Sequence, residues 1–508
     1  MLINCKVTIV FDSSFMLQKL RNLGKQTFVY GLGSILNKML GFILIPLYYH
    51  HIPIEHYGTL VFYETIIVFL AAFLNYGIGP GLQRYFYIEK ENGTYGKFLF
   101  NNFLGCIILS VASIVPILLF SGDFASAFFG DKGQSLNLQL AMWIVVSDVL
   151  FILPLQVLQY EEKPLLYLLY NALKLIASFS FTIFFVVGQS MGIEGILYAR
   201  LSGGLISLLL VSFVIIVPRC SFIIDFNSLK RTIKFGFPLV ISNIGYTLFV
   251  VSDRFMLTWL STSEEVGKYG FGFKIANFIN LIFVQTIGMS YFPSVMSNES
   301  KTDNVRYYRK MLTYYCFLMA VLILGFLFFY PDLLRIAGKN DKYWEGLKVV
   351  PLLGLSFMIM GMNYFLGVGL FLKNQTKYYL IPSFSAAGVN FLLNLWLIPK
   401  LGMMGAAYSV VIAQIIYASL LAFLSGKHLK VDFEWVKVFS IYILAIAIFE
   451  AGSHLNIKNF FLSIAIKMVM LAIFPVLLYQ LNFFEAIEIQ RVKEGCFKLL
   501  SKIKMLNQ

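Results

Sequence analysis

Long apolar runs of about 20 residues follow one another along almost the whole chain, and only short polar breaks separate them. An α-helix needs roughly 20 apolar residues to cross the hydrocarbon core of a bilayer. The pattern therefore predicts an all-α integral membrane protein with about 14 transmembrane helices. The expected spans are residues 27–49, 58–80, 98–120, 139–160, 165–187, 193–217, 236–260, 266–293, 310–330, 347–371, 377–398, 403–425, 436–453 and 459–481.

Composition and charge agree with this class. The 508 residues are 59% hydrophobic and 13% charged, with a mean hydropathy of +0.77, which excludes a water-soluble chain. The net charge of +14 could indicate a nucleic-acid partner, but most Lys and Arg residues fall in loops on one side of the predicted spans. This bias instead predicts cytoplasmic termini and no nucleic-acid partner. One predicted outer loop departs from this positive-inside bias, because it carries four basic residues, Arg335, Lys339, Lys342 and Lys348.

Motifs of enzymes and metalloproteins are missing from the sequence. It contains no G-x-x-x-x-G-K-[ST] and no H-E-x-x-H motif, and its five cysteines and five histidines lack the spacing of metal ligands. No predicted outer loop is long enough for a catalytic domain. We therefore expect a protein that is not an enzyme and that has no cofactor or metal. The basic segment that begins at Met16 is typical of the lead into a first span, so we expect translation to start there.

An internal repeat divides the chain. Gly-Ile-Glu-Gly at residues 192–195 recurs as Gly-Met-Met-Gly at 402–405, and a tyrosine follows each motif three residues later. The shift corresponds to six spans, so the two halves have the same orientation. Parallel repeats of this kind are typical of transporters, with the substrate path between two lobes. The predicted domains are a cytoplasmic lead at 1–26, an N-lobe at 27–218, a C-lobe at 219–426, two further helices at 427–482 and a basic cytoplasmic tail at 483–508.

Several predicted spans contain ionisable side chains, which are costly at membrane depth and need a partner or a function. The cations are Lys38, Lys174, Arg200, Arg254 and Lys274, the acids are Glu64, Asp148 and Asp253, and Glu450 and Lys467 lie in the last two spans. Helical spacing places Asn277 on the face of Lys274, and Asn243 on the face of Asp253. These polar lines predict a hydrated, positively charged cavity that suits a phosphate or pyrophosphate group.

Two alternatives remain open for these charges. Each cation could pair with an acid on a neighbouring helix, for example Lys274 with Glu64. The three acids could carry a proton or a sodium ion, although a counter-ion role is favoured over ion coupling. Arg84, at the cytoplasmic end of the second span, is either an interfacial anchor or a cation at the entry to the cavity.

Motifs in both halves of the chain occur together in one known family. They are Tyr30-Gly31-Leu32-Gly33-Ser34, Gly41-Phe42, Tyr57-Gly58, Gly77-Ile-Gly79-Pro-Gly81-Leu-Gln-Arg84, Phe235-Gly-Phe-Pro238, Ser252-Asp253-Arg254, Val266-Gly267-Lys-Tyr269 and Leu397-Ile398-Pro399-Lys400-Leu-Gly402. In this order and spacing they resemble the bacterial oligosaccharide flippases of the Wzx type. These are polysaccharide biosynthesis transporters of the multidrug/oligosaccharidyl-lipid/polysaccharide (MOP) superfamily. The resemblance covers nearly the whole chain.

The resemblance implies two six-helix lobes with two C-terminal helices, in the bacterial cytoplasmic membrane. It implies alternating access that carries a polyprenyl-diphosphate-linked oligosaccharide to the outer leaflet for O-antigen, capsule or exopolysaccharide assembly. Membrane lipids, glycosyltransferases and a polysaccharide polymerase are its expected partners. Lys38 and Arg254 lie on helices comparable to those that carry basic cavity residues in related lipid II flippases. The alternative hypotheses for the function are a cation-coupled multidrug exporter, a membrane-embedded glycan polymerase or ligase, and a non-transporting scaffold.

Overall fold

Helices make up nearly all of the structure. In the computed structural model, the described residues are 44–288, 291, 304–337, 341–373, 375–453, 460–481 and 483, and none of them is in a strand. The long helices are α3 (Ile54–Leu74), α5 (Tyr95–Leu119), α7 (Ser135–Tyr160), α8 (Pro164–Thr182), α9 (Gly192–Val211), α10 (Phe226–Leu260), α11 (Ser263–Ile279), α13 (Asn304–Ala337), α15 (Val350–Leu366), α17 (Leu380–Leu401), α18 (Met403–Gly426), α19 (Trp435–Ser453) and α20 (Phe460–Gln480).

Shorter elements connect or extend the long helices. The short α-helices are α2 (Ile45–His51), α4 (Ile78–Glu91), α6 (Ser121–Phe129), α14 (Asp341–Glu345) and α16 (Val368–Leu372). The π-helical turns are η2 (Ile183–Gly188), η3 (Ser212–Ile216) and η5 (Asn280–Val284). The 3₁₀ turns are η1 (Lys132–Gln134), η4 (Val217–Arg219), η6 (Gly346–Val349) and η7 (Thr376–Tyr379).

The helices confirm the predicted class of a multi-pass membrane protein. Among the described residues, twelve helical stretches are long and apolar enough to cross a bilayer, and the two halves of α10 make a thirteenth candidate. These stretches match the predicted spans from 98–120 onward, and Ile54–Leu74 covers most of the predicted span 58–80. The first predicted span, 27–49, lies mostly outside the described residues, which begin at Leu44 and include α2.

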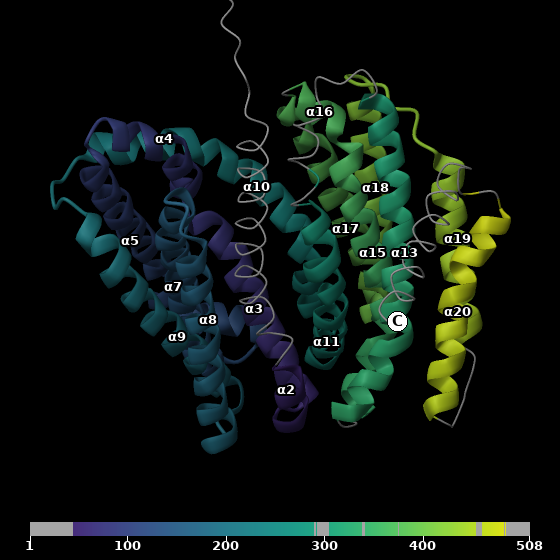
Figure 1. The fold of residues 1–508 in the computed structure, drawn as a ribbon. Helices are drawn as coiled ribbons and strands as arrows, with labels where there is room; N and C mark the ends of the chain where they lie inside the picture. Colours follow the sequence, from purple (N-terminus) through teal and green to yellow (C-terminus); the bar gives the residue numbers. More distant parts are fainter. Residues whose placement is uncertain are drawn as a thin grey trace, which may run out of the picture. The chain divides into compact units, whose positions relative to one another are not determined.

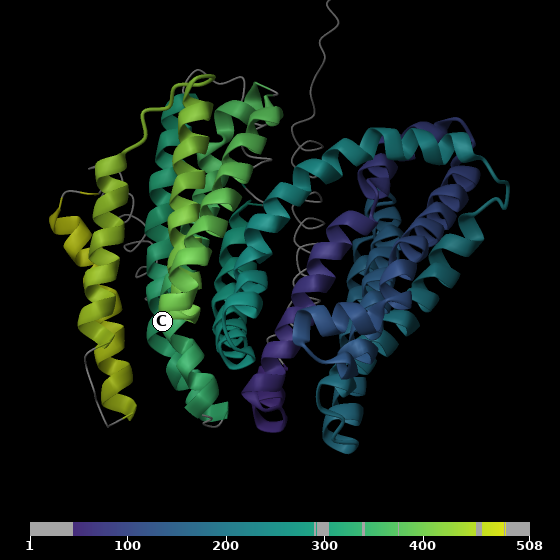
Figure 2. The ribbon, with the colours of Figure 1, turned by 180° about the vertical axis from the view of Figure 1, so that it is seen from behind.

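The first compact unit contains the described residues up to Phe278 and two later segments, 341–349 and 383–410. Within it, α9 packs against α7 and α8, and α3 packs against α7. These helices run beside one another in Figure 1. The long helix α10 packs against α3, α4 and α5, and Figure 2 shows its teal ribbon crossing the ends of these helices before it turns along the unit.

The second compact unit contains the remaining described residues, from Ile279 onward. Its centre is α13, which packs against α15, α19 and α20, and α19 packs against α20. Lys467 on α20 donates to Asp332 on α13 at 2.5 Å, so this membrane-depth cation has an acid on the neighbouring helix. The last two spans are therefore fixed to the rest of this unit by a charge pair as well as by apolar packing.

Helix α10 is bent rather than straight. Its segments Phe226–Pro238 and Asn243–Leu260 meet at 57°. Proline removes a backbone donor and crowds the preceding turn, so Pro238 supplies a physical cause for a bend at this place. The predicted span started at residue 236, but the helix starts ten residues earlier. The apolar pattern did not reveal this start, because the first turns of the helix are charged.

The second predicted span, 58–80, is interrupted in the structure. Helix α3 ends at Leu74, and α4 begins at Ile78 after Gly77, whose φ is +76°. A side chain is unfavourable at this φ. A Cβ on Gly77 would also collide with the backbone of Gly236 on α10, and a Cβ on Gly236 would collide with the backbone of Gly77. The two glycines therefore allow α10 to touch the turn between α3 and α4.

We predict that Gly236→Ala destabilises the protein by about 1–3 kcal/mol, because the added methyl group meets backbone atoms that cannot rotate away. Gly388→Ala on α17 is the matched control, since a Cβ there meets no atom within 4 Å and alanine favours a helix. Thermal unfolding of the detergent-purified variants tests this. Equal melting temperatures for the two variants would contradict the close contact.

Candidate functional site

A carboxylate shared by two cations lies inside the first unit. Asp148 on α7 accepts from Lys174 Nζ on α8 at 2.7 Å and from Arg200 Nη2 on α9 at 2.9 Å. Lys174 Nζ also lies 4.3 Å from the centre of the Phe151 ring, a cation–π contact. The packing of α9 against α7 and α8 brings these side chains together, and the cluster retains one positive charge in excess.

A second ion pair joins α3 to α11. Lys274 Nζ donates to Glu64 Oε1 at 2.9 Å, which is the pairing that the sequence left open as an alternative. The ammonium group lies 5.1 Å from the ring centre of Tyr48 and 5.3 Å from that of Tyr57. Two aromatic faces and one carboxylate thus replace much of its hydration.

These two clusters lie on neighbouring helices, since α3, which carries Glu64, contacts α9, which carries Arg200. We call the two clusters together the charge network. It contains three cations and two acids, which leaves a single positive charge without an acid in it. Such an arrangement keeps each cation oriented and accommodates one additional negative group.

Arg254 on α10 differs from the other cations. It is only 8% exposed, and its guanidinium carbon lies 3.6 Å from the ring centre of Phe273 on α11. Neither Nε nor Nη2 has a hydrogen-bond partner among the described residues. The adjacent Asp253 is directed elsewhere, and its oxygens accept from the Tyr269 hydroxyl and from the Arg254 backbone N–H. A buried guanidinium with unused donors is suited to an anionic ligand.

The remaining predicted site residues are more scattered. Asn277 is half-buried on α11, one turn from Lys274. Asn243 on α10 and Arg84 on α4 are exposed. Lys38 lies outside the described residues. Of the predicted set, the structure thus brings Lys174 together with Asp148 and Lys274 together with Glu64, whereas Arg254 is not paired with the adjacent Asp253.

Some polar groups were missed in the predicted site. Arg200 was identified as a charge within a span but not as a member of the site, although it shares Asp148. Asn390 on α17 accepts from Ser252 Oγ at 3.0 Å and from Asn394 Nδ2 at 2.5 Å, and both asparagines are fully buried. Two asparagines four residues apart in an apolar span were a signal that could have found this cluster.

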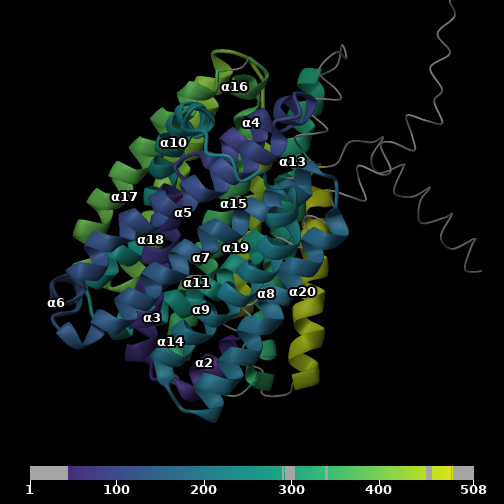
Figure 3. The ribbon, with the colours of Figure 1, turned by 90° about the vertical axis from the view of Figure 1, so that its left-hand side faces the viewer.

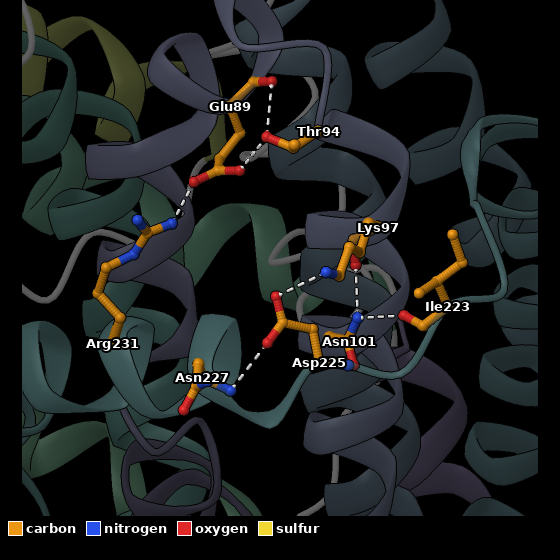
Figure 4. Close-up of polar contacts among 8 residues, drawn as sticks. All are labelled: Glu89, Thr94, Lys97, Asn101, Ile223, Asp225, Asn227 and Arg231. Atoms are coloured by element: carbon orange, nitrogen blue, oxygen red, sulfur yellow. Dashed lines mark hydrogen bonds and ion pairs between the residues drawn. The ribbon is translucent and has the colours of Figure 1, made fainter.

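At one end of the first unit, ion pairs fix the start of α10. Arg231 on α10 pairs with Glu89 on α4, and Lys97 on α5 pairs with Asp225 at 3.1 Å, directly before α10 (Figure 4). Asp225 also accepts from the backbone N–H of Asn227 at 3.1 Å, so it caps α10. The hydrogen bond from Lys97 lowers the pKa of the Asp225 carboxyl. These contacts hold the first segment of α10 on α4 and α5.

A carboxylate held by two cations also lies in the turn between α7 and α8. Glu161 accepts from Arg219 Nε at 2.7 Å and Nη2 at 2.9 Å, and Lys163 Nζ lies 2.6 Å away. Burial alone would raise the pKa of Glu161, but the hydrogen bonds from Arg219 and Lys163 outweigh it and lower the pKa to about 2. The carboxylate therefore stays ionised well below neutral pH.

A second group of contacts lies at the start of α3, away from the turn between α3 and α4. There α2, α3, α11 and α14 meet (Figure 3). Lys342 on α14 donates to Glu55 on α3 at 2.8 Å, and the Tyr343 hydroxyl donates to the Ile52 carbonyl at 2.8 Å. The backbones of α3 and α11 approach closely, since Gly58 has no side chain. A Cβ at this position would collide with the Ser263 carbonyl oxygen. We call these contacts the α3–α14 closure.

The fold is that of the multi-pass membrane proteins of the MOP superfamily. The structure is similar to that of a lipid II flippase, MurJ, in an inward closed conformation, with a TM-score of 0.69 and 15% identity over 90% of this chain and 100% of that one. It is also similar to a multidrug resistance MATE family transporter of the MOP superfamily in an inward-facing conformation (TM-score 0.58, 14% identity, 80% and 96%). A Vibrio cholerae MATE transporter matches with a TM-score of 0.57 and 12% identity over 82% and 98% of the chains.

Sequence comparison assigns the family. Residues 23–299 match the model of the polysaccharide biosynthesis protein family, which is more than half of the chain. The protein belongs to this family. No curated protein sequence matches it.

We predict that Asp148→Asn destabilises the first unit by about 3 kcal/mol, because Lys174 and Arg200 would both lose their partner in a poorly hydrated site. Asp123→Asn is the control, since Asp123 and its partner Lys132 are both 74% exposed and such pairs contribute little. Melting curves of the purified variants provide the measurement. A loss no larger than that of the control would show that water compensates the two cations.

Proposed function

We propose that this protein is a flippase that moves a polyprenyl-diphosphate-linked oligosaccharide from the inner to the outer leaflet of the bacterial cytoplasmic membrane, for surface polysaccharide assembly. The observation that carries the proposal is the excess of positive charge at membrane depth in a chain of the polysaccharide biosynthesis family. A diphosphate needs cations to replace the water that it leaves behind. Arg254 Nε and Nη2 have no hydrogen-bond partner among the described residues and can donate to the diphosphate, and the cluster around Asp148 has one uncompensated charge.

We propose the following roles for the charged and polar residues. Arg254 and Lys274 contact the diphosphate as it passes, with Lys38 and Lys174 as further contacts. Asp148 and Glu64 keep their cations oriented and prevent them from holding the diphosphate too firmly. Tyrosine and asparagine side chains, including Asn277 and Asn243, stack on sugars or hydrogen-bond to them. Arg84 attracts the anion at the entry, and the prenyl tail stays in lipid.

The transport cycle is alternating access by two lobes, residues 27–218 and 219–426, with residues 427–482 as an appendage. Both termini are cytoplasmic in this proposal, because the basic first turns of α5 and α10, and Arg219 at the end of η4, then face the cytoplasm. The α3–α14 closure then lies on the outer side and opens to release the cargo. Its exposed Lys342–Glu55 pair is weak enough to break in each cycle. Glycosyltransferases and a polymerase are the proposed functional partners.

Deletion of the gene tests the function directly. We expect loss of surface polysaccharide and accumulation of the lipid-linked repeat unit on the cytoplasmic face. Complementation with Arg254→Ala or Lys38→Ala should restore less than a tenth of the polymer, because loss of one charged contact costs roughly 1.5–3 kcal/mol. Lys132→Ala, which removes an exposed lysine whose partner Asp123 is equally exposed, should restore it fully.

Other outcomes of this experiment favour other functions. Normal glycan pools with raised sensitivity to cationic drugs would indicate a multidrug exporter. Repeat units that reach the outer leaflet but do not polymerise would indicate a polymerase or ligase. Full activity of both alanine variants would leave a scaffold as the remaining interpretation.

The α3–α14 closure generates a separate prediction. In a Glu55→Cys/Lys342→Cys variant, a short bismaleimide should link the two helices and abolish transport, because the outer side could no longer open. The matched control is Asp123→Cys/Lys132→Cys, a pair in the connection between α5 and α7, whose linkage should leave transport intact. Active protein after complete linkage at 55 and 342 would exclude this closure as a gate.

A further inference from the structure

A small cavity lies at the junction between the last helix of the repeat and the C-terminal pair. It has a volume of about 250 Å³ and lies in the second unit, where α18 ends and α19 begins. Apolar side chains from both helices and from their connection line it, chiefly Ala422, Phe423, Leu429, Val431, Phe433 and Trp435. Three of the eight lining residues are aromatic, and polar atoms make up a large share of the lining.

The position of the cavity along the helices corresponds to a membrane boundary. Helices α18 and α19 are both candidate membrane spans, and the connection between them, residues 427–434, is polar. Tryptophan and lysine gather where hydrocarbon meets headgroups. Trp435, the first residue of α19, is at this level, and Phe423 is 62% exposed one turn inside it. The cavity therefore opens at the depth of lipid headgroups.

Two lysines beside the cavity have no acid bound to them. Lys427 Nζ lies 4.4 Å from the ring centre of Phe423, which lines the cavity, and Lys430 is exposed in the same connection. Neither lysine makes an ion pair within the part of the chain that the structure describes. Asp432 is the one exposed acid in the connection, so the local balance is positive.

The other acid of the connection, Glu434, is already occupied. It accepts from Lys310 at 3.1 Å and from Thr313 at 2.9 Å, and Lys437 Nζ lies 3.3 Å away. Burial alone would raise the pKa of Glu434, but these hydrogen bonds outweigh it and lower the pKa. Glu434 is therefore an ionised, fully used carboxylate that anchors the connection to α13. It does not neutralise Lys427 or Lys430.

We propose that this cavity binds one anionic phospholipid. The lipid phosphate lies between Lys427 and Lys430, and the glycerol part of the lipid occupies the cavity beside Phe423 and Trp435, from which an acyl chain leaves. The chain then continues along the exposed apolar face of α19, where Val436 and Phe439 are 82% and 60% exposed. The site is independent of the transported substrate. Its assignment to the cytoplasmic leaflet rests on the orientation given above.

Native mass spectrometry of the purified, full-length protein tests the site with phosphatidylglycerol as the probe and phosphatidylcholine as the neutral comparison. We expect one tightly held phosphatidylglycerol on the unaltered protein. Lys427→Gln/Lys430→Gln should weaken it by about tenfold or more, since each basic residue near anionic lipid adds several-fold to the affinity. Ala422→Phe, which fills the cavity without changing charge, should also displace the lipid.

The control is Lys230→Gln/Lys234→Gln, two exposed lysines on α10 in the first unit. It should retain the lipid, and all variants should show unchanged melting temperatures in lipid-free detergent. Equal loss from this control would mean that only general surface charge attracts the lipid, and the site would be refuted. Retention of phosphatidylglycerol by both the lysine and the Ala422→Phe variants would also refute it. Transport activity does not enter the readout, so failure of the flippase proposal would leave this result unaffected.

Discussion

The cost of dehydrating a charge is the constraint on which the rest of this structure depends. An ionised side chain at the bilayer centre costs about 2.5 kcal/mol or more, so each such group must be compensated by its neighbours. Here the compensation comes from contacts between helices, as in the Asp148 carboxylate between Lys174 and Arg200. The same pairs that solve the solvation problem also determine which helices lie together, because α7, α8 and α9 cannot separate without exposing unpaired charge to lipid.

Close backbone contact and charge pairing act together on α10. Its first segment is held by Arg231–Glu89 and Lys97–Asp225, and Gly236 meets Gly77 at the turn between α3 and α4. Beyond the bend near Pro238, its second segment carries Ser252, Asp253 and Arg254 toward α17 and α11. One helix thus connects a fixed polar end to the buried polar groups. A rigid anchor beside a bend is a mechanically useful arrangement for a transporter.

The fold could be predicted from the sequence because the bilayer fixes the length and composition of each span. The spans from 98–120 onward match helices closely, whereas 58–80 is divided at Gly77, since an apolar run does not reveal a left-handed residue. The early start of α10 was missed for the complementary reason, because its first turns are charged. The ion-pair partner of each charged residue was harder to predict. Lys274 and Glu64 are 210 residues apart, and helical spacing gives the face of a residue but not the helix opposite it.

Among the buried charges, the contrast between Arg254 and the other cations carries the most functional information. Lys174, Arg200 and Lys274 each have a carboxylate within 3 Å, so their net attraction for a ligand is reduced by a group that the ligand must compete with. Arg254 stacks on Phe273, and within the part of the chain that the structure describes its Nε and Nη2 have no hydrogen-bond partner. A protein stabilised only by pairing would have no use for that arrangement. An anion that arrives would complete these hydrogen bonds, and because a buried donor without a partner is costly, the incomplete pairing in its absence would strengthen binding of the anion.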